Sequence, residues 1–402
     1  MITDRFEVPS RLRLTGIVLL LVGVATLIGG MIGLMTGSEH DQARFWIGLL
    51  HNSVYFLFIA VSAVFIQAAA GLAQGGWIVA YRRVPEAIGA NVWVFGIVAL
   101  VILFCIVFGL GEHNPIYHWV HPGDDKVLQG KTAFLNKWMY AGFSIVTVGL
   151  WSWFGIKFRR NSIAQETAPK NTTKLYWKMV ALSGAFLFLY ALTMMSTTPW
   201  LWIMSINAHW YSTLFSWYVF SSAFVSSMAV ILLFVIILKN NGNLQTVTKE
   251  HMHDLGKFMF AFSIFWTYLW FCQFMLIWYS NIPEETSYFK LRAQGPYSFF
   301  FYLNIVVNFA LPILILMTRP SKRNYFTVVF MAMVIIFGHW LDFYLMSVPE
   351  VLLGNWTLSW YELGIPVGFI GLMLLVVTNT LSKANLVPVN DPLLKESLNH
   401  VS

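Results

Sequence analysis

The chain alternates between long apolar runs and short polar segments, and the lengths of the runs predict transmembrane helices. A helix needs about 20 apolar residues to cross roughly 30 Å of hydrocarbon. In lipid these runs must be helical, because an isolated strand cannot satisfy its backbone hydrogen bonds there. We therefore expect an all-α integral membrane protein with about ten transmembrane helices. The runs are Leu14–Met35, Phe45–Ala73, Gly89–Leu110, Phe134–Ile156, Leu175–Ser196, Ser212–Leu238, Leu255–Tyr279, Tyr297–Thr318, Tyr325–Met346 and Tyr361–Leu381.

The composition supports the same class. Of the 402 residues, 58% are hydrophobic and only 11% are charged, against about a quarter charged in soluble domains. The net charge of +7 raises the question of nucleic acid. However, the basic residues lie between apolar runs and form no stripe with interleaved aromatic residues, so nucleic acid is excluded as a partner. Lipid is the expected surrounding.

The basic residues also predict the orientation of the chain, because cytoplasmic loops carry an excess of Lys and Arg. With the N-terminus inside, the outside segments hold fewer basic residues than the inside segments. Both termini are then cytoplasmic, which an even number of spans requires, and we expect a bacterial inner membrane. The inside residues are Arg82, Arg83, Lys157, Arg159, Arg160, Lys170, Lys174, Lys239, Lys249, Arg319, Lys322 and Arg323. The outside residues are Arg44, Lys126, Lys131, Lys290 and Arg292.

A weak internal repeat predicts how the helices are grouped. Gly89 and Gly256 are 167 residues apart, and so are Cys105 and Cys272. Four spans return the chain to the same side of the membrane, so we expect a parallel repeat of two four-helix bundles. The predicted division is 1–40 for an N-terminal segment with helix 1, 41–200 for the first bundle and 201–350 for the second. Residues 351–402 form helix 10 and a cytoplasmic tail.

Ionisable and polar side chains inside spans are costly in lipid, so they are the candidate functional residues. His339 and Asp342 are three positions apart and share one face of the ninth helix. Gln273, Asn304 and Asn308 are expected at a similar depth in neighbouring spans. We interpret these five residues as a proton path through the second bundle. The alternative is that they only form hydrogen bonds between helices.

Two smaller sets of candidates lie nearer the ends of the spans. His51, Asn52 and Tyr55 begin the second span on the outside, where a histidine can hydrogen-bond a quinone carbonyl. These residues are equally suited to contacting a loop. On the inside, Asp254 and Lys257 begin the seventh span, where Asp254 would suit a proton entrance or form an ordinary ion pair.

The sequence offers no ligand set for a redox centre. Its two cysteines exclude a disulfide framework, a Cys-ligated iron–sulfur cluster and a covalent c-type haem. We expect no paired histidines for a b-type haem and find no P-loop, HExxH or GxSxG motif. We expect no metal site and no catalytic residue in the chain itself.

The stretch HDLGKFMFAFSIFWTYLWFCQFMLIWYSNIPEET (253–286), followed by HWLD at 339–342, resembles the ActF type of NrfD/PsrC-like membrane subunits. ActF belongs to alternative complex III, a bacterial assembly that oxidises quinol and passes electrons to cytochrome c or a terminal oxidase. The resemblance implies two four-helix bundles with flanking helices. It also implies ActC-like membrane partners, and periplasmic iron–sulfur and multihaem c-type partners that carry the haem and the clusters.

The family's quinol site lies in the first bundle near the periplasmic surface. Here spans three to five, as predicted above, carry no carboxylate within the bilayer. A contact with menaquinone or ubiquinone is therefore less favoured than a proton half-channel or a scaffold role. The alternatives are a purely structural anchor and a secondary transporter. Transporters tend to have broken helices in matching positions, and Pro312 has no proline counterpart near Ile145.

Overall fold

The computed structural model describes residues 4–110, 114–169, 173–354 and 359–401. Within these ranges the chain is helical without strands and contains ten helices long and apolar enough to span a membrane. The prediction of an all-α integral membrane fold is confirmed. The predicted inside residue Lys170 and the first three residues of the outside segment 111–131 lie outside the described residues.

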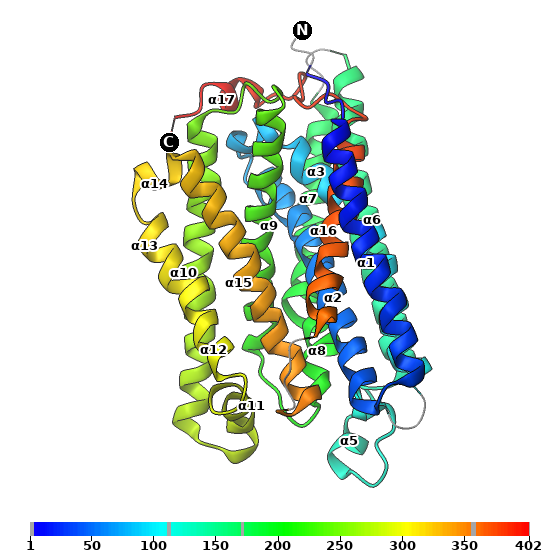
Figure 1. Ribbon diagram of the computed structural model, residues 1–402. Helices are drawn as coiled ribbons and strands as arrows, with labels where there is room; N and C mark the ends of the chain where they lie inside the picture. The colour runs from blue at the N-terminus through cyan, green and yellow to red at the C-terminus, as the bar shows by residue number, and fades with distance from the viewer. Residues whose placement is uncertain (1–3, 111–113, 170–172, 355–358, 402) are drawn as a thin grey trace.

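Figure 1 shows the spans as a bundle of nearly upright helices. The first group contains α2 (Glu39–Leu72), α4 (Val92–Gly109), α6 (Lys137–Thr167) and α7 (Lys174–Leu192). In this group α2 contacts α4 and α7, while α6 contacts α4 and α7. The short α3 (Arg83–Gly89) leads into α4, and α7 continues through the π-helical turn η3 (Thr193–Thr197) into α8 (Thr198–Trp202).

The second group contains α9 (Leu214–Asn240), α10 (Lys249–Ser280), α12 (Ser298–Ile305) and α15 (Tyr325–Leu352). The span that begins with α12 passes through a second π-helical turn, η5 (Val306–Ala310), into α13 (Leu311–Leu316). Helix α9 contacts α10 and α15, and α15 contacts α12. The two groups meet where α2 packs against α9 and α15.

Helices α1 (Ser10–Thr36) and α16 (Trp360–Leu381) pack together beside these groups. Small residues allow their backbones to approach closely, as is usual between membrane helices. A Cβ atom added to Gly23 would lie 2.3 Å from the Cα of Gly368, and one added to Gly371 would lie 2.4 Å from the nitrogen of Leu20. These glycines therefore fix the distance between α1 and α16.

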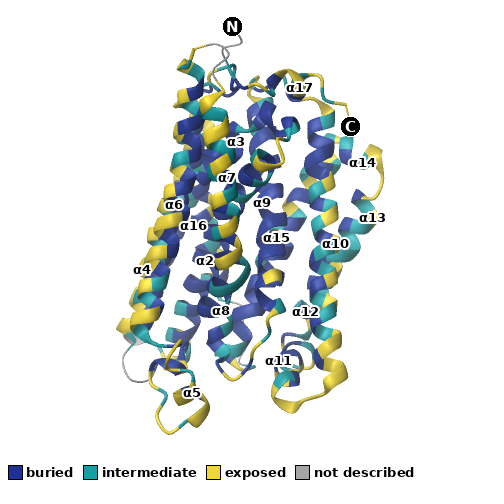
Figure 2. Ribbon diagram, turned by 180° about the vertical axis from the view of Figure 1, so that it is seen from behind, coloured by how far each residue is buried: buried dark blue, intermediate teal, exposed yellow. Residues whose placement is uncertain are grey.

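Burial separates the central helices from those that face lipid. In the most apolar window of each helix, 83% of α2 and 89% of α9 is buried, against 17% of α1 and 28% of α10. Figure 2 shows the same contrast between dark blue central helices and yellow outer faces. Apolar side chains exposed on α1 and α10 are what a lipid-facing surface requires.

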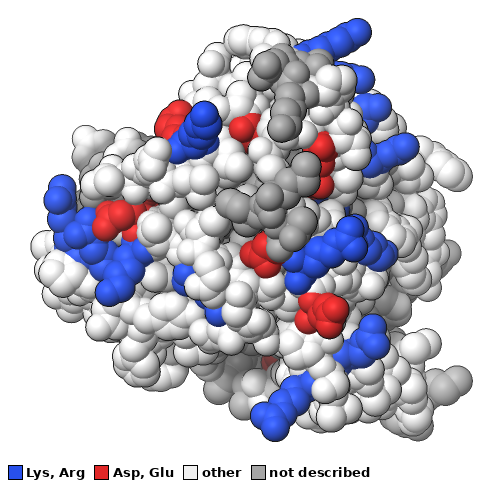
Figure 3. All heavy atoms as spheres, turned by 90° about the horizontal axis from the view of Figure 1, so that it is seen from above, with Lys and Arg blue, Asp and Glu red and all other residues white. Residues whose placement is uncertain are grey.

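Both ends of the chain lie at the same end of the bundle, which we call the terminal end. The backbone N–H of Leu386 donates to the carbonyl of Asp4 at 2.9 Å. Figure 3 looks onto this end and shows Lys and Arg side chains around it, several with Asp or Glu beside them. Its location in the cytoplasm stays a prediction. We call the other side the opposite end.

Short helices fill the connections: η1 (Gly76–Tyr81), η2 (His118–Val120), α5 (Lys126–Gly130), η4 (Met204–Asn207), α11 (Pro283–Ala293), α14 (Arg319–Arg323) and α17 (Leu394–Leu398). Two of the basic residues predicted for outside loops are buried instead. Arg44 lies in α2 and pairs with Glu362 at 3.3 Å, and Arg292 lies in α11 and pairs with Glu350 at 2.7 Å. Buried pairing removes these charges from the loop surface.

Candidate functional site

Asp342 lies at the centre of the second group and is fully buried. Each of the other three spans in that group donates one hydrogen bond to its carboxylate. Trp266 of α10 donates from Nε1 to Oδ2 at 2.8 Å, and Asn304 of α12 donates from Nδ2 to Oδ1 at 2.8 Å. The hydroxyl of Tyr218, in α9, also donates to Oδ1. A buried carboxylate is costly unless donors surround it, and this arrangement supplies three.

His339 lies one helical turn before Asp342 and is also fully buried. Its Nδ1 is 4.0 Å from Oδ2 of Asp342 and 2.9 Å from the hydroxyl of Ser222. Within the described ranges, its Nε2 has no hydrogen-bond partner. A buried ring nitrogen without a partner can still bind a proton or form a hydrogen bond with a water molecule.

A row of serines on α9 continues the polar contacts away from His339. Ser226 donates to the carbonyl of Ser222 at 2.8 Å, and the hydroxyl of Tyr55 donates to Ser226 at 3.2 Å. The same hydroxyl lies 2.8 Å from the carbonyl of Ile336. The polar contacts from Asp342 therefore extend to α2, which belongs to the first group.

Asn308 lies in the π-helical turn η5 and donates to Oδ1 of Asn304 at 2.6 Å. Pro312 follows one turn later and has no N–H for the carbonyl of Asn308. The side-chain Oδ1 of Asn308 has no partner among the described residues. Helix α15 passes very close here, since a Cβ atom on Gly338 would lie 2.2 Å from that oxygen.

Gln273 is buried and lines a small cavity beside the residues that donate to Asp342. Tyr218 and Asn304, both bonded to Asp342, line the same cavity. Tyr288 and Arg292 of α11, at the opposite end, also line it. The structure thus brings together His339, Asp342, Gln273, Asn304 and Asn308, which the sequence placed at similar depth.

Asp254 does not join this cluster. It lies at the terminal end of α10, where its carboxylate is 2.6 Å from Nζ of Lys257 and 2.5 Å from Nε2 of His400. The C-terminal segment therefore reaches back over the second group. Asp254 borders a separate, more open hollow together with Trp77 and Phe258.

The suggested quinone contacts are buried between the two groups of helices. His51 lies with Nε2 3.1 Å from the carbonyl of Trp340 and Nδ1 3.3 Å from the amide of Asn52. Asn52 accepts a hydrogen bond from Nε1 of Trp340 at 2.9 Å. A quinone carbonyl would therefore have to displace an existing partner of His51.

The helices of the third and fourth spans extend beyond the apolar runs and carry carboxylates near the terminal end, whereas the absence of a carboxylate within the bilayer stays a prediction. The candidate third span begins at Arg83 and the fourth ends at Thr167, so they include Glu86 and Glu166. Glu86 is buried and accepts from Arg82 at 3.0 Å and from Arg83 at 2.7 Å. The apolar runs ended earlier than the helices because ion pairs allow the charged turns to be buried.

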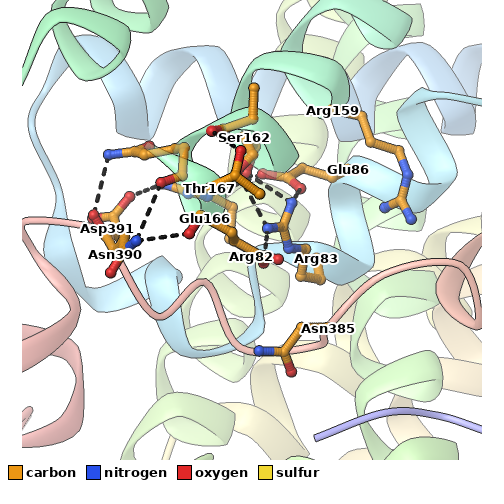
Figure 4. A network of polar contacts seen from close by, with 12 residues as sticks. Arg82, Arg83, Glu86, Arg159, Ser162, Glu166, Thr167, Asn385, Asn390 and Asp391 are labelled. Atoms are coloured by element: carbon orange, nitrogen blue, oxygen red, sulfur yellow. Dashed lines mark hydrogen bonds and ion pairs between the residues drawn. The ribbon is translucent and has the colours of Figure 1, made fainter. Parts of the chain in front are cut away.

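Figure 4 shows these charges as one network at the terminal end. Arg83 also pairs with Glu166, and Arg82 reaches Asp391 of the C-terminal segment at 2.5 Å. Burial alone would lower the pKa of Arg82, but the charges of Asp391 and Glu86 outweigh it and raise that pKa. The network therefore ties α3, α6 and the C-terminal segment together.

The sequence reasoning missed Tyr218, Trp266, Ser222 and Arg292. The segment SSAFVSS (221–227) held a usable signal, since serines four positions apart form a polar stripe on an apolar helix. Among the described residues, no group of three His, Cys, Asp or Glu side chains could hold a metal ion. In comparisons with known proteins, no family model and no curated protein matches this chain.

Proposed function

We propose that this chain is a non-haem membrane subunit of a quinol-oxidising respiratory complex of the alternative complex III type, in a bacterial inner membrane. Its second group of helices would serve as a proton half-channel. The resemblance of residues 253–286 suggests the complex. The observation that carries the half-channel is the fully buried Asp342, which receives one donor from each of the other three spans of the group. Two of these donors, Tyr218 and Asn304, line a cavity.

In this proposal Asp342 is the residue that takes up and releases the proton. His339, 4.0 Å away, is the second group able to hold it. The cavity lined by Gln273 and Asn304 leads toward the opposite end, and water within it would carry the proton. The serines of α9 extend the polar contacts only as far as Tyr55, so the path reaches one surface of the membrane.

The test is Asp342→Asn, which keeps the size of the side chain and removes its charge. Proton release and electron transfer should be measured together in proteoliposomes that contain the whole complex. We expect assembly to be retained and proton release per electron to fall. An assembled mutant with both quantities equal to wild type would show that Asp342 only holds the helices together. His51→Ala is the matched control, with an expected change in quinol oxidation of less than about tenfold.

The proposed soluble partners would bind at the opposite end. That end exposes large aromatic side chains, among them Trp138 at 81% and Tyr279 at 83% of their surface. ActC-like membrane subunits, periplasmic iron–sulfur and multihaem c-type subunits and a terminal oxidase are the proposed partners. Cross-linking in native membranes from residues 281–294 should capture a soluble partner. Contacts with lipid alone would contradict this.

A secondary transporter is the second candidate, because one span in each half is interrupted. The π-helical turns η3 and η5 precede Pro199 and Pro312 by two residues. Such interruptions often lie at functional sites. The two spans are the fifth and the eighth, which the 167-residue repeat does not pair. Uptake of a solute by the chain alone in liposomes would favour transport over the subunit proposal.

A further inference from the structure

Arg292 is the charged residue among the described residues that line the cavity beside Tyr218 and Asn304, two hydrogen-bond donors of Asp342. It belongs to α11, outside the membrane spans, yet only 2% of its surface is exposed. Its guanidinium lies 3.4 Å from the centre of the Tyr288 ring. The ring of Trp210 also stacks on that of Tyr288, with the two ring centres 4.2 Å apart. Burial raises the pKa of Tyr288 to about 12, so its hydroxyl stays neutral.

The bonds of Arg292 to α15 are explained by one missing backbone hydrogen bond within that helix. Pro349 lies inside this helix and has no N–H, so the carbonyl of Leu345 lacks its usual helical donor. Nε of Arg292 donates to that carbonyl at 2.7 Å, and Nη2 lies 3.4 Å from the carbonyl of Met346. A residue from α11 therefore takes the place of the missing backbone donor, one turn beyond Asp342.

Two further hydrogen bonds hold Arg292 in place. Nη1 donates to the carbonyl of Tyr288 and to Oε1 of Glu350, both at 2.7 Å. The other oxygen of Glu350 accepts from Asn207 at 2.9 Å. A backbone carbonyl that loses a side-chain donor can accept a hydrogen bond from water instead. Three of the contacts that hold Arg292 are thus with backbone carbonyls, which water could satisfy in its place.

We propose that Arg292 is the gate of this cavity: it closes the cavity against the aqueous phase at the opposite end, and its displacement admits water toward Asp342. The gate deepens the proposed function, because the half-channel needs an opening on this side. Access of a reagent to the cavity can be measured without proton transfer. The gate and the half-channel can therefore fail separately.

The experiment starts from a cysteine-free variant, in which the two native cysteines, Cys105 and Cys272, are replaced by serine. Gln273→Cys then places a single thiol in the cavity wall. The purified chain in nanodiscs is treated with a small, charged methanethiosulfonate, and the labelling rate is followed by mass spectrometry. We expect slow labelling with Arg292 present and at least about tenfold faster labelling after Arg292→Gln, since labelling tracks the open population.

Two further variants keep the result decisive. Glu350→Gln removes the negative charge that pairs with Arg292 and leaves the carbonyl bonds, so a smaller increase is expected. Arg44→Gln breaks another buried ion pair at the same end that does not line the cavity, and should leave the rate unchanged. The gate is refuted if no folded variant of Arg292 or Glu350 labels faster, or if Arg44→Gln accelerates labelling equally. Faster labelling combined with normal proton release in Asp342→Asn would retain the gate and reject the half-channel.

Discussion

The close crossing of α15 over η5 depends on Gly338. Gly338→Ala should therefore disturb Asp342 indirectly, through Asn308 and Asn304. The new Cβ atom would lie 2.2 Å from Oδ1 of Asn308 and 2.5 Å from Cγ1 of Val307. Carbon and oxygen atoms in contact are usually about 3.3 Å or more apart. Asn308 or the helix must therefore move by about 1 Å. The movement would strain the bonds from Asn308 to Asn304 and from Asn304 to Asp342.

The size of the effect follows from two opposing terms. Replacing glycine by alanine in a helix gains up to about 1 kcal/mol. Overpacking a filled site costs about 1–3 kcal/mol. Gly149→Ala in α6 is the matched control, because a Cβ atom there meets nothing within 4 Å. The propensity term is common to both variants, so Gly338→Ala should be less stable than Gly149→Ala by about 1–3 kcal/mol.

The assay compares the midpoints of thermal unfolding of both variants in the same detergent. The carboxyl band of Asp342 in the infrared spectrum, assigned with Asp342→Asn, reports on the site itself. We expect a lower midpoint and a shifted band for Gly338→Ala only. Equal midpoints together with an unchanged band would refute the argument that Gly338 sets the distance between α15 and Asn308.

Two other predictions concern the periphery. A Cβ atom added to Gly368 would lie only 2.6 Å from the Cα of Gly23, so Gly368→Ile should force α1 away from α16. The midpoint of thermal unfolding should then fall. An unchanged midpoint would contradict the close contact between the two glycines. At the opposite end, the backbone N–H of Leu128 and then the side chain of His209 hold the pKa of Asp125 below its usual range. A depressed folded pKa stabilises the fold above the pKa of the unfolded chain, and this stability is lost as the pH falls through the folded value. Asp125→Asn should therefore be less stable than wild type at neutral pH and equal to it in strong acid, which acid titration of the unfolding midpoint would check.

The buried charges at the terminal end explain one failure of the sequence reasoning. The third span was expected to begin at Gly89, where the apolar run begins, but the candidate span starts at Arg83. The burial of Glu86 could not be recognised from the sequence, because it depends on Arg82 and Arg83 meeting Asp391 and Glu166. Hydropathy counts each charge as a cost and contains no information about its partner.

The sequence by itself determined the ten helices and singled out His339 and Asp342 as candidate residues. Both depend on local properties: the length of an apolar run and the cost of an ionisable group within it. Only the tertiary structure decided what surrounds Asp342. Tyr218 is 124 residues away along the chain, and Arg292 reaches α15 from a loop helix at a carbonyl that Pro349 leaves without its helical donor. Such partners are chosen by the packing of separate helices, because a buried polar group must find a donor or acceptor wherever the fold provides one.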